Sequence, residues 1–413
     1  MNMEVCIVCN QTVEIHFPAH FHRVYLNLLP ERGYKTKVIA FTNDIDSETS
    51  KALIGQNVRL FRKPPRKGLW SLFYAAIVIP LKVFYLLSSG KEYNSTRIYM
   101  VHNDPYIGFI VWLISKWRKS PFIFRITHLI PEEVMMRKAF MSRITGSVTK
   151  YIRDALSRKS NYVLPTSEEM KRTLIHSASI SEDKCVVLPA TVDVVNQYKE
   201  LACHSFVEQT RKKLEFVGCE KWLVYIGTLS PSRQLKLIID CLSVIRGIHK
   251  GKSVGLAVLG VSSVKSHLHD LVTYAETEGV SEAIAWCDPV PDECLPDCIS
   301  MMDVGLSPFP LDPVMRNNSP LKSLEYLRSG VCVVASKIPE SVYIIEESKG
   351  GLLADFNARD FAKAASSLLF EDKKKRDERV LESKKWIQRN RDISTAADII
   401  EQVFLDCEPL SNG

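Results

Sequence analysis

The sequence lacks both glycine-rich signatures that mark nucleotide-binding loops in many α/β proteins. Neither G-x-G-x-x-G nor G-x-x-x-x-G-K-[ST] occurs among its 413 residues, which argues against a dinucleotide fingerprint and against a P-loop. Low-complexity runs and internal repeats at solenoid periods are also absent. A repeat protein and a low-complexity, disordered chain are therefore excluded.

The eleven cysteines show neither the spacing of a disulfide framework nor that of a zinc site. Cys6 and Cys9 lie inside an apolar, strand-like run, where cysteine behaves as a small hydrophobe. Cys294 and Cys298 have no second pair of cysteines or histidines at zinc spacing. We therefore expect no bound metal, and reduced cysteines in a cytoplasmic protein.

Long apolar runs are scarce. The most apolar stretch extends from Leu69 to Leu87, and Pro80 and Lys82 interrupt it, which leaves it marginal as a membrane-spanning helix. Residues 1–4 lack a basic leader, and the apolar run that follows them is too short for a signal peptide. Both features favour a cytoplasmic location.

Positive charge is only slightly in excess: 54 Lys and Arg residues stand against 47 Asp and Glu residues, which gives a net charge of +7. This balance suits an anionic ligand or an anionic membrane surface, and it is too small to indicate nucleic acid. The hydrophobic content of 46% and the charged content of 24% are typical of a globular protein. The length predicts two or three domains.

Strand-like and helix-like segments alternate along the chain, which predicts parallel sheets covered by helices on both faces. The alternation stops in a polar stretch at about 190–220 and then restarts. We expect an α/β fold with two doubly wound, Rossmann-like domains that face a cleft. The first covers residues 1–195 and is completed by a C-terminal helix at about 385–413, and the second covers residues 196–384. In such folds ligands bind beyond the carboxyl ends of the strands.

One segment late in the chain has the pattern of a short helix with an anion-binding start. Ser319 suits the cap, Pro320 the first helical position, and Gly330 the left-handed position past the end. Lys322 and Glu325 share a face near the helix N-terminus, where backbone N–H groups and the helix dipole attract phosphate. The pattern also fits an ordinary capped helix with a solvated charge pair, and the segment alone leaves both interpretations open.

Two other features follow predicted strands. Gly227 allows close backbone approach, and Thr228 and Arg233 in the loop after it supply hydrogen-bond donors for a diphosphate. His128 stands at the end of a strand in the first domain, where an imidazole can bind a sugar hydroxyl. A glycine after a strand is common and a lone histidine is more often structural, so neither feature decides the function.

Several segments spread over nearly the whole chain occur in the order of a known family. They are Thr127-His128, Pro165–Met170, Leu188–Asp193, Tyr225–Leu229, Pro289–Pro291, Asp303–Pro308, Ser319–Gly330 and a C-terminal helix around Trp386. Together they resemble GT-B glycosyltransferases of family 4, which move a sugar from a nucleotide diphosphate to an acceptor with retention at the anomeric carbon. In that fold the C-terminal helix crosses back to the first domain.

The resemblance implies a role for each matching position. Glu325 matches the carboxylate that binds the donor ribose, Arg233 matches a cation on the donor diphosphate, and His128 matches the histidine near the donor sugar. These three are the predicted catalytic residues. The predicted substrate-binding residues are Gly227, Thr228, Val290 in the base-binding loop, Asn317, Asn318, Ser319, Pro320, Leu321 and Lys322.

Two positions depart from the pattern of the family. Asn317 stands where the family often has a glutamate, and Thr228 stands where it often has an arginine. Arg233 and Lys322 still leave two cations for the diphosphate, and Asn317 can hydrogen-bond sugar hydroxyls without a negative charge. The departures affect the identity of the donor sugar more than the reaction class, and they also leave open a weakly active or inactive member.

The implied activity is retaining transfer from a nucleotide-diphosphate sugar, with a UDP-sugar favoured, to a glycan or lipid-linked acceptor in polysaccharide or glycolipid assembly. No cofactor is implied besides this donor, because the cations and the helix dipole stabilise the leaving diphosphate. Two alternatives stay open. One is a nucleotide-sugar epimerase of the same fold, and the other is a non-catalytic subunit that binds a nucleotide-sugar.

Basic and aromatic residues gather in two places in the first domain. The first group is Arg59, Arg62, Lys63, Arg66 and Lys67 ahead of Leu69–Tyr74, and the second is Trp112, Lys116, Trp117, Arg118 and Lys119. Such groups suit anionic lipid headgroups, although a core-facing helix with a solvated basic rim has the same composition. We expect peripheral contact with the inner face of the membrane.

Overall fold

The structure, a computed structural model, describes residues 3–12, 23–42, 57–62, 77–90, 94–137, 139–194, 203–250, 253–260 and 265–407. Contacts between Cα atoms divide the chain into two compact units. The N-terminal unit comprises Met1–Pro189 and Ile393–Gly413, and the C-terminal unit comprises Ala190–Asp392.

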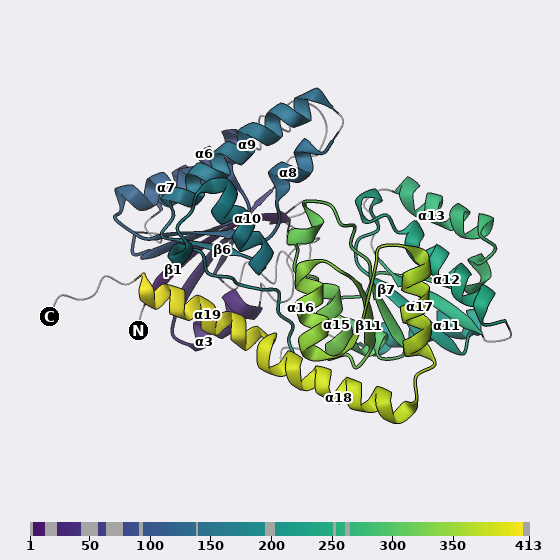
Figure 1. The fold of residues 1–413 in the computed structure, drawn as a ribbon. Helices are drawn as coiled ribbons and strands as arrows, with labels where there is room; N and C mark the ends of the chain where they lie inside the picture. The colour runs from purple at the N-terminus through teal and green to yellow at the C-terminus, as the bar shows by residue number, and fades with distance from the viewer. Residues whose placement is uncertain are drawn as a thin grey trace. The chain divides into compact units, whose positions relative to one another are not determined.

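The N-terminal unit is built on a six-stranded parallel sheet with the strand order β3-β2-β1-β4-β5-β6 (Figure 1). Its strands are β1 (Glu4–Thr12), β2 (Lys35–Thr42), β3 (Val58–Arg62), β4 (Ile98–His102), β5 (Phe122–Ile126) and β6 (Tyr162–Pro165). Every residue of β4 and β5 is buried, as expected for parallel strands that helices cover on both faces. The order reverses between β1 and β4, which is the doubly wound arrangement.

Helices lie on both faces of this sheet, with α6, α7 and α9 above it and α3 and α19 below it in Figure 1. The helices are η1 (Arg23–Leu28), α3 (Leu29–Glu31), α6 (Ile79–Ser89), α7 (Pro105–Trp117), α8 (Ile130–Met135), α9 (Phe140–Lys159), α10 (Glu168–Ala178), η4 (Glu182–Lys184) and α19 (Ile393–Asp406). Local sequence explains some starts. Asp104 caps α7 by accepting from the N–H groups of Tyr106 and Ile107 at 2.9 Å, and Ser167 caps α10.

The last helix, α19, belongs to the N-terminal unit although it ends the described chain. Arg32 binds Asp398 at 2.7 Å and Glu401 at 2.8 Å. The hydroxyl of Tyr34 donates to Glu401 at 3.3 Å, and its ring packs on Phe404. These contacts bind α19 to the segment between η1 and β2.

The C-terminal unit repeats the plan with the order β12-β11-β10-β7-β8-β9, again wholly parallel. Its strands are β7 (Lys221–Ile226), β8 (Val254–Leu259), β9 (Ile284–Cys287), β10 (Val304–Ser307), β11 (Cys332–Ser336) and β12 (Gly351–Ala354). Its α-helices are α11 (His204–Val217), α12 (Lys236–Ile248), α13 (Lys265–Thr277), α14 (Leu295–Ile299), α15 (Leu321–Arg328), α16 (Pro339–Ser348), α17 (Ala358–Leu369) and α18 (Lys373–Asn390). Its 3-10 turns are η5 (Pro231–Arg233), η6 (Ser281–Ala283) and η7 (Met315–Asn317).

Alternation along β7 sends side chains into two separate cores. Leu223 and Tyr225 join the core beneath α12, α13 and α17. Trp222, Val224 and Ile226 join the core beneath α11, α14, α15, α16 and α18. The period of two in the strand therefore supplies both faces of the sheet, which is what a doubly wound domain requires.

The two doubly wound domains predicted from the sequence are confirmed, and a cleft between them stays a prediction. The units meet at Pro189/Ala190 and Asp392/Ile393, compared with the expected 195/196 and about 385. Trp386 lies in α18 of the C-terminal unit, where its ring packs on Tyr343, and α19 is the helix that joins the N-terminal unit. Among the described residues, no helix has both the length and the hydropathy needed to span a bilayer.

The expectation that all cysteines are reduced is wrong for one pair. A disulfide joins Cys203 and Cys294, whose Cα atoms are 5.2 Å apart. Cys203 precedes α11 and Cys294 precedes α14, so the bond ties together the starts of two helices on one face of the sheet. The sequence separation is 91 residues, and spacing alone could not pair them. The other nine cysteines are free thiols.

This disulfide predicts the thiol content of the protein. Chains denatured without reductant should titrate with nine thiols, and with eleven after reduction. Cys294→Ser should add one reactive thiol to the unreduced sample, because it releases Cys203. The matched variant Cys219→Ser, outside the bond, should remove one. Eleven thiols without reductant would contradict the pairing.

Candidate functional site

The strand order of the C-terminal unit reverses between β7 and β10, and this is where a doubly wound sheet binds ligands. The loop after β7 carries Gly227, and the segment after β10 leads through η7 into α15. Most of the predicted donor-site residues therefore follow these two neighbouring strands, while Val290 follows β9 and His128 follows β5 of the N-terminal unit.

Tyr326 fastens α15 to both of these strands. Its hydroxyl accepts a hydrogen bond from the N–H of Ile226 at 2.8 Å and donates to the carbonyl oxygens of Val224 and Leu306 at 3.2 and 3.3 Å. Burial raises the pKa of Tyr326 well above its ordinary value, so the phenol keeps the proton that it donates. One side chain thus positions the helix over β7 and β10.

Gly305 makes this close contact between helix and sheet geometrically feasible. A Cβ atom at this position in β10 would lie 2.4 Å from the ring of Tyr326, where no side chain fits. Ser323 in α15 adds a second tie to β10, because its hydroxyl donates to that of Ser307 at 2.8 Å. The start of α15 is therefore held rigidly against the sheet.

The loop after β7 begins with a backbone conformation that favours glycine. Gly227 has a φ of 121°, in the region that other residues rarely adopt, and its N–H donates to the carbonyl of Leu259 at 3.1 Å. The carbonyl of Thr228 accepts from the hydroxyl of Tyr225 at 3.2 Å, while Thr228 itself is exposed. Gly227 and Thr228 thus lie exposed at the carboxyl edge of the sheet, and their predicted contact with a substrate stays a prediction.

Two cations converge on the ring of Phe309, which follows β10. The guanidinium of Arg233 lies 5.0 Å from the ring centroid, and Nζ of Lys322 lies 4.9 Å from it. Lys322 also lies 4.3 Å from the ring of Tyr225 and donates to its hydroxyl at 3.3 Å. In the part of the chain that the structure describes, neither Arg233 nor Lys322 forms an ion pair.

This arrangement leaves Lys322 in an unfavourable environment for a positive charge. Burial holds its pKa well below the ordinary value, and the charge of Arg233 lowers it further. The same burial raises the pKa of Tyr225 to about 12, which keeps that phenol neutral. Two positive charges lie beside one ring, and no carboxylate among the described residues neutralises them. A bound anion would therefore stabilise this pair of charges.

The start of α15 differs in detail from the prediction. Ser319 does not cap the helix, because Pro320 occupies the cap position and the hydroxyl of Ser319 accepts from the N–H of Ala190 at 3.3 Å. The N–H of Leu321 donates to the carbonyl of Ser319 at 3.0 Å. Gly330 has a φ of 79°, and the predicted left-handed position after the helix is confirmed.

Glu325 lies one turn further along α15. It pairs with Arg328, whereas Lys322 contacts Tyr225. Its carboxylate binds Nε of Arg328 at 2.6 Å, and both side chains are almost completely buried. Arg328 also donates to the carbonyl of Asp193 at 2.7 Å. Glu325 is thus held in a fixed orientation by Arg328, and its predicted contact with a ribose stays a prediction.

Asn317 and Asn318 are buried in and directly after η7, where the pattern that the sequence resembles often has a glutamate at the first position. The amide nitrogen of Asn317 donates to the carbonyl of Pro313 at 2.7 Å. A carboxylate has no donor for this bond, so the local backbone suits asparagine better than glutamate. The side-chain nitrogen of Asn318 lies 3.2 Å from the sulfur of Met315, which also contacts Arg233.

Val290 lies in the loop after β9, at the carboxyl edge of the same sheet. Lys213 from α11 holds this loop, because its Nζ donates to the carbonyl of Trp286 and to Asp288, both at 2.9 Å. The disulfided Cys294 ends the loop, and its N–H donates to the carbonyl of Pro291 at 2.9 Å. The predicted base-binding loop is therefore anchored at both ends.

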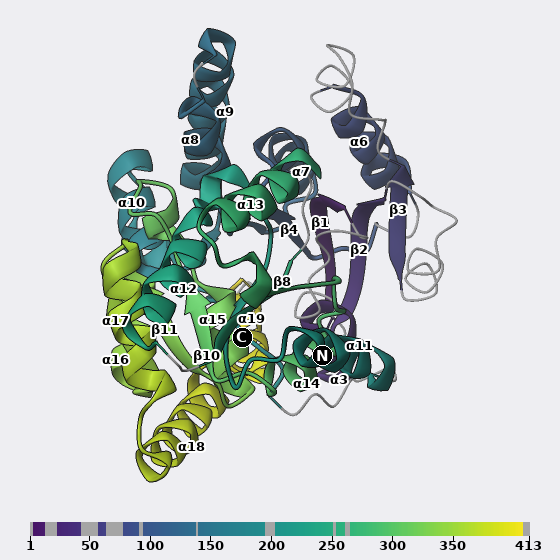
Figure 2. The same cartoon turned by 90° about the vertical axis from the view of Figure 1, so that its right-hand side faces the viewer.

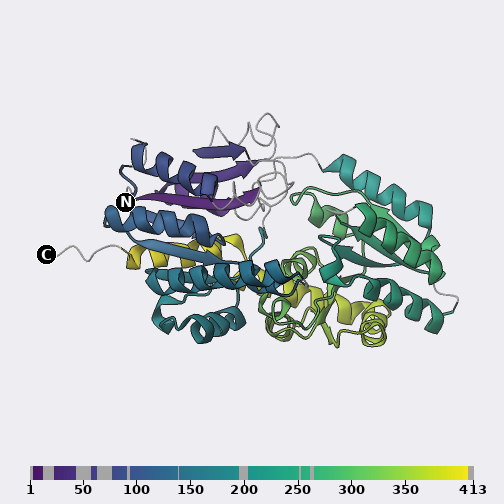
Figure 3. The same ribbon diagram turned by 90° about the horizontal axis from the view of Figure 1, so that it is seen from above.

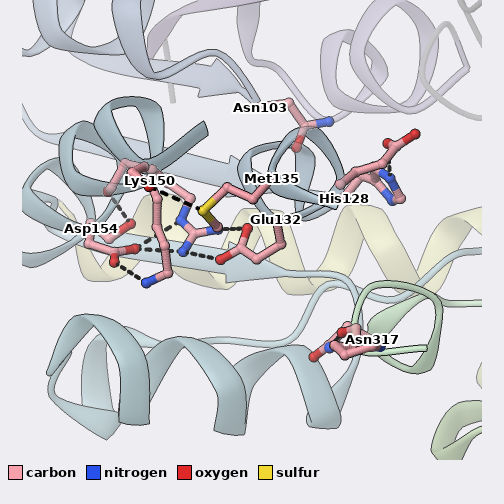
Figure 4. A network of polar contacts seen from close by, with 12 residues as sticks. Asn103, His128, Glu132, Met135, Lys150, Asp154 and Asn317 are labelled. Carbon is pink, nitrogen blue, oxygen red and sulfur yellow. Dashed lines mark hydrogen bonds and ion pairs between the residues drawn. The ribbon is translucent and has the colours of Figure 1, made fainter. Parts of the chain in front are cut away.

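His128 follows β5 in the N-terminal unit and lies beside Asn103 in Figure 4. Its Nε2 lies 2.8 Å from a carboxylate oxygen of Glu133 in α8, which orients the ring. The N–H of Thr127 donates to Asn103 at 2.7 Å, and the amide of Asn103 donates back to the hydroxyl of Thr127. The structure places His128 at the carboxyl edge of its sheet as predicted, and its role near a sugar stays a prediction.

Sequence reasoning missed Tyr225, Phe309 and Tyr326 as parts of this site. In the sequence each looks like an ordinary core aromatic, and only the fold shows that two of them present a hydroxyl and that Phe309 meets two cations. The sequence could have indicated Phe309, because this residue follows the strand that precedes the predicted anion-binding helix.

Comparison with protein families identifies the central part of the C-terminal unit. Residues 220–371 match the family model described as Glycosyl transferases group 1. The chain contains a Glycosyl transferases group 1 domain. This segment includes β7, the Gly227–Arg233 loop, η7 and α15, and hence the two cations at Phe309. No curated protein sequence gives a significant match to the chain.

Solved structures resemble the whole chain. HepE from Anabaena, in complex with UDP and glucose, is 15% identical over 98% of this chain and 100% of its own, with a TM-score of 0.73. A glycosyltransferase from Rickettsia africae is 14% identical over 100% of both chains, with a TM-score of 0.72. Sucrose-phosphate synthase from Thermosynechococcus elongatus is 13% identical over 98% and 99%, with a TM-score of 0.74. These likenesses establish the fold, which is the GT-B fold predicted from the sequence.

The buried charge of Lys322 should lower stability in a way that depends on pH. Its pKa in the folded protein lies below that of an exposed lysine, about 10.4, so the unfolded chain binds more protons. The contribution of this group therefore becomes less destabilising as the pH rises from the folded pKa to about 10.4. Lys322→Met should be more stable than wild type at neutral pH, and urea unfolding should show this advantage shrinking at alkaline pH.

The matched control is Lys363→Met, which changes an exposed lysine on α17 of the same unit. We expect no comparable gain and no comparable pH dependence from it. A Lys322→Met variant that is less stable than wild type, or an advantage that stays constant with pH, would contradict the cost assigned to this charge.

Proposed function

We propose that the protein is a glycosyltransferase that takes a sugar from a nucleotide-diphosphate sugar, with a UDP-sugar favoured. The observation that carries the proposal is the pair of cations, Arg233 and Lys322, that meet at Phe309 without a carboxylate partner among the described residues. The group 1 domain that contains them and the UDP-bound structure of HepE support a diphosphate as the missing anion.

The chemistry follows from charge at this site. In our mechanism the bond between the anomeric carbon and the β-phosphate oxygen breaks while the diphosphate gains negative charge. Arg233, Lys322 and the N-terminus of α15 stabilise that charge, and the depressed pKa of Lys322 returns toward its ordinary value when the anion binds. The helix does not need to move during the step, because Tyr326 already holds it against the sheet.

The acceptor supplies the new bond to the sugar. Its hydroxyl oxygen attacks the anomeric carbon on the face that the diphosphate leaves, and its proton passes to the leaving diphosphate. This course retains the anomeric configuration, which is the course that the family resemblance predicts. Glu325 orients the donor through its ribose, and His128 remains the predicted contact to the donor sugar. We propose that the acceptor is a glycan or a lipid-linked glycan. The transfer would take place in the cytoplasm, during the assembly of a polysaccharide or glycolipid.

Binding of UDP tests the site directly. Arg233→Ala and Lys322→Met should each weaken UDP binding by roughly ten- to a hundredfold, because each removes a charge-assisted contact of about 1.5–3 kcal/mol. Glu325→Gln should also weaken UDP binding, since it keeps the shape of the side chain and removes its charge. Calorimetric titration measures all three.

The matched control for these variants is Arg359→Ala, which removes an exposed cation on α17 of the same unit. It should bind UDP like wild type. Unchanged affinity in both Arg233→Ala and Glu325→Gln would refute the site assignment.

Product analysis separates the proposed transferase from its two rivals. With UDP-sugars and a panel of glycan acceptors, a transferase yields UDP and a new glycoside in equal amounts. An epimerase changes the donor sugar without any acceptor, and a non-catalytic subunit binds UDP but produces neither. Either of the last two results would overturn the proposed reaction while leaving the nucleotide site intact.

A further inference from the structure

Three neighbouring helices of the N-terminal unit expose apolar stripes to solvent. The helices α6, α7 and α9 pack side by side, in blue in Figures 1 and 3. Each carries exposed apolar side chains spaced about four residues apart, which places them on one helix face. They are Ile77, Leu81, Phe84 and Tyr85 at α6, Phe109, Leu113 and Trp117 on α7, and Phe140, Met141, Ile144, Val148 and Tyr151 on α9. We call this set the apolar face.

The apolar face is too exposed to be the rim of a core. Phe140 is 74% exposed and Tyr151 is 72% exposed, although both belong to long, regular helices. Isolated apolar side chains on a surface need no explanation, but exposed apolar stripes on three helices that pack side by side point to an interaction site.

Charge on the same helices has one sign. Together α6, α7 and α9 carry seven Lys or Arg side chains and a single carboxylate, Asp154. That carboxylate is buried and paired, because it binds Lys150 at 2.8 Å and Arg153 at 2.7 Å. Exposed cations, among them Lys116, Arg143 and Lys159, therefore lie on the same three helices as the apolar face, and these helices carry no exposed carboxylate.

The end of α9 that carries Phe140 and Met141 projects together with α8 from the unit (Figure 2). A buried ion pair braces this pair of helices, because Arg153 of α9 binds both carboxylate oxygens of Glu132 of α8 at 2.7 and 2.9 Å (Figure 4). Gly146 allows the close approach, since a Cβ atom there would lie 2.5 Å from Met135. These contacts hold α8 and the projecting end of α9 together.

Between the three helices the surface is hollowed. The hollow has a volume of about 280 Å³ and is lined by Pro80, Tyr106, Phe109, Ile110 and Ile152. Its lining is almost wholly apolar, with the hydroxyl of Tyr106 occupied by that of Thr149 at 2.8 Å. The hollow can take a hydrocarbon segment but offers little to a polar ligand.

We infer that α6, α7 and α9 form a docking surface for an anionic lipid bilayer. The apolar stripes enter the interfacial layer, and the bordering cations meet the lipid headgroups. A membrane fits better than a second copy of the chain, because the same cations would face one another in a symmetric dimer, at an electrostatic cost. The surface also revises the sequence-based expectation of membrane contact.

That expectation named two groups of residues, and the structure describes only part of the first. Lys63, Arg66, Lys67 and Leu69–Tyr74 of the first group lie outside the described residues. In the second group, Lys116 and Trp117 are exposed, but Arg118 binds the carbonyl of Leu87 at 2.6 Å and the hydroxyl of Tyr99 at 2.9 Å. Arg118 is thus a structural link, and α9 supplies the larger share of the surface.

Co-sedimentation with vesicles tests the inference on the full chain, without donor or acceptor. Wild type should bind vesicles of phosphatidylcholine with phosphatidylglycerol, and bind pure phosphatidylcholine far less. The double variant F140S/Y151S should lower the partition coefficient at least about tenfold, because it removes two apolar anchors. The double variant R143E/K159E should do the same, and added salt should weaken the binding of wild type.

Matched controls exist in the C-terminal unit. Phe216→Ser changes an even more exposed apolar residue, at 93%, and Lys363→Glu reverses an exposed charge on α17. Both should bind vesicles like wild type. Failure of wild type to bind anionic vesicles, equal losses in the controls, or a solution dimer that F140S/Y151S dissociates would each overturn the inference. Because vesicle binding needs no turnover, such a failure would leave the proposed transferase activity untouched.

Discussion

The candidate site of the C-terminal unit depends on one buried hydroxyl. The hydroxyl of Tyr326 on α15 hydrogen-bonds the N–H of Ile226 and the carbonyl groups of Val224 and Leu306. These bonds connect α15 to the neighbouring strands β7 and β10. Removing that hydroxyl would leave a buried N–H without its partner, at a cost of about 1–3 kcal/mol. This close contact requires a glycine at position 305 of β10, since any side chain there would push Tyr326, and with it α15, away from the sheet. Lys322 and Glu325 of the candidate site lie on this helix.

A rigid helix start makes the electrostatics of the site useful. Arg233 and Lys322 face the same ring, and both residues are half-buried, so water screens their charges less than it would at the open surface. The folded protein therefore keeps a charge arrangement that is unfavourable until an anion arrives. In the proposed reaction, such preorganised charge would lower the barrier for a leaving diphosphate, since little reorganisation is needed. The N-terminal unit adds a separate feature, a basic and apolar surface suited to the lipid phase in which a lipid-linked acceptor would reside.

The sequence predicted the two doubly wound domains because alternation of strands and helices depends on local pattern alone. It also located the Gly227 loop and the left-handed Gly330, where backbone conformation selects the residue. It failed where long-range contacts decide. Ser319 looked like a cap but binds Ala190, and Cys203 found a partner 91 residues away. The exposed stripe of α9 could not be told from a core-facing stripe, because periodicity does not show which face is covered.

The central claim is that the cations at Phe309 bind a diphosphate. Calorimetric titration of the wild-type protein with UDP and with uridine tests it most directly, because the two ligands share the base and the ribose and differ only in the phosphates. The account predicts that UDP binds at least about a hundredfold more tightly than uridine, since only UDP offers an anion to both cations. Equal affinities, or a preference for uridine, would contradict it.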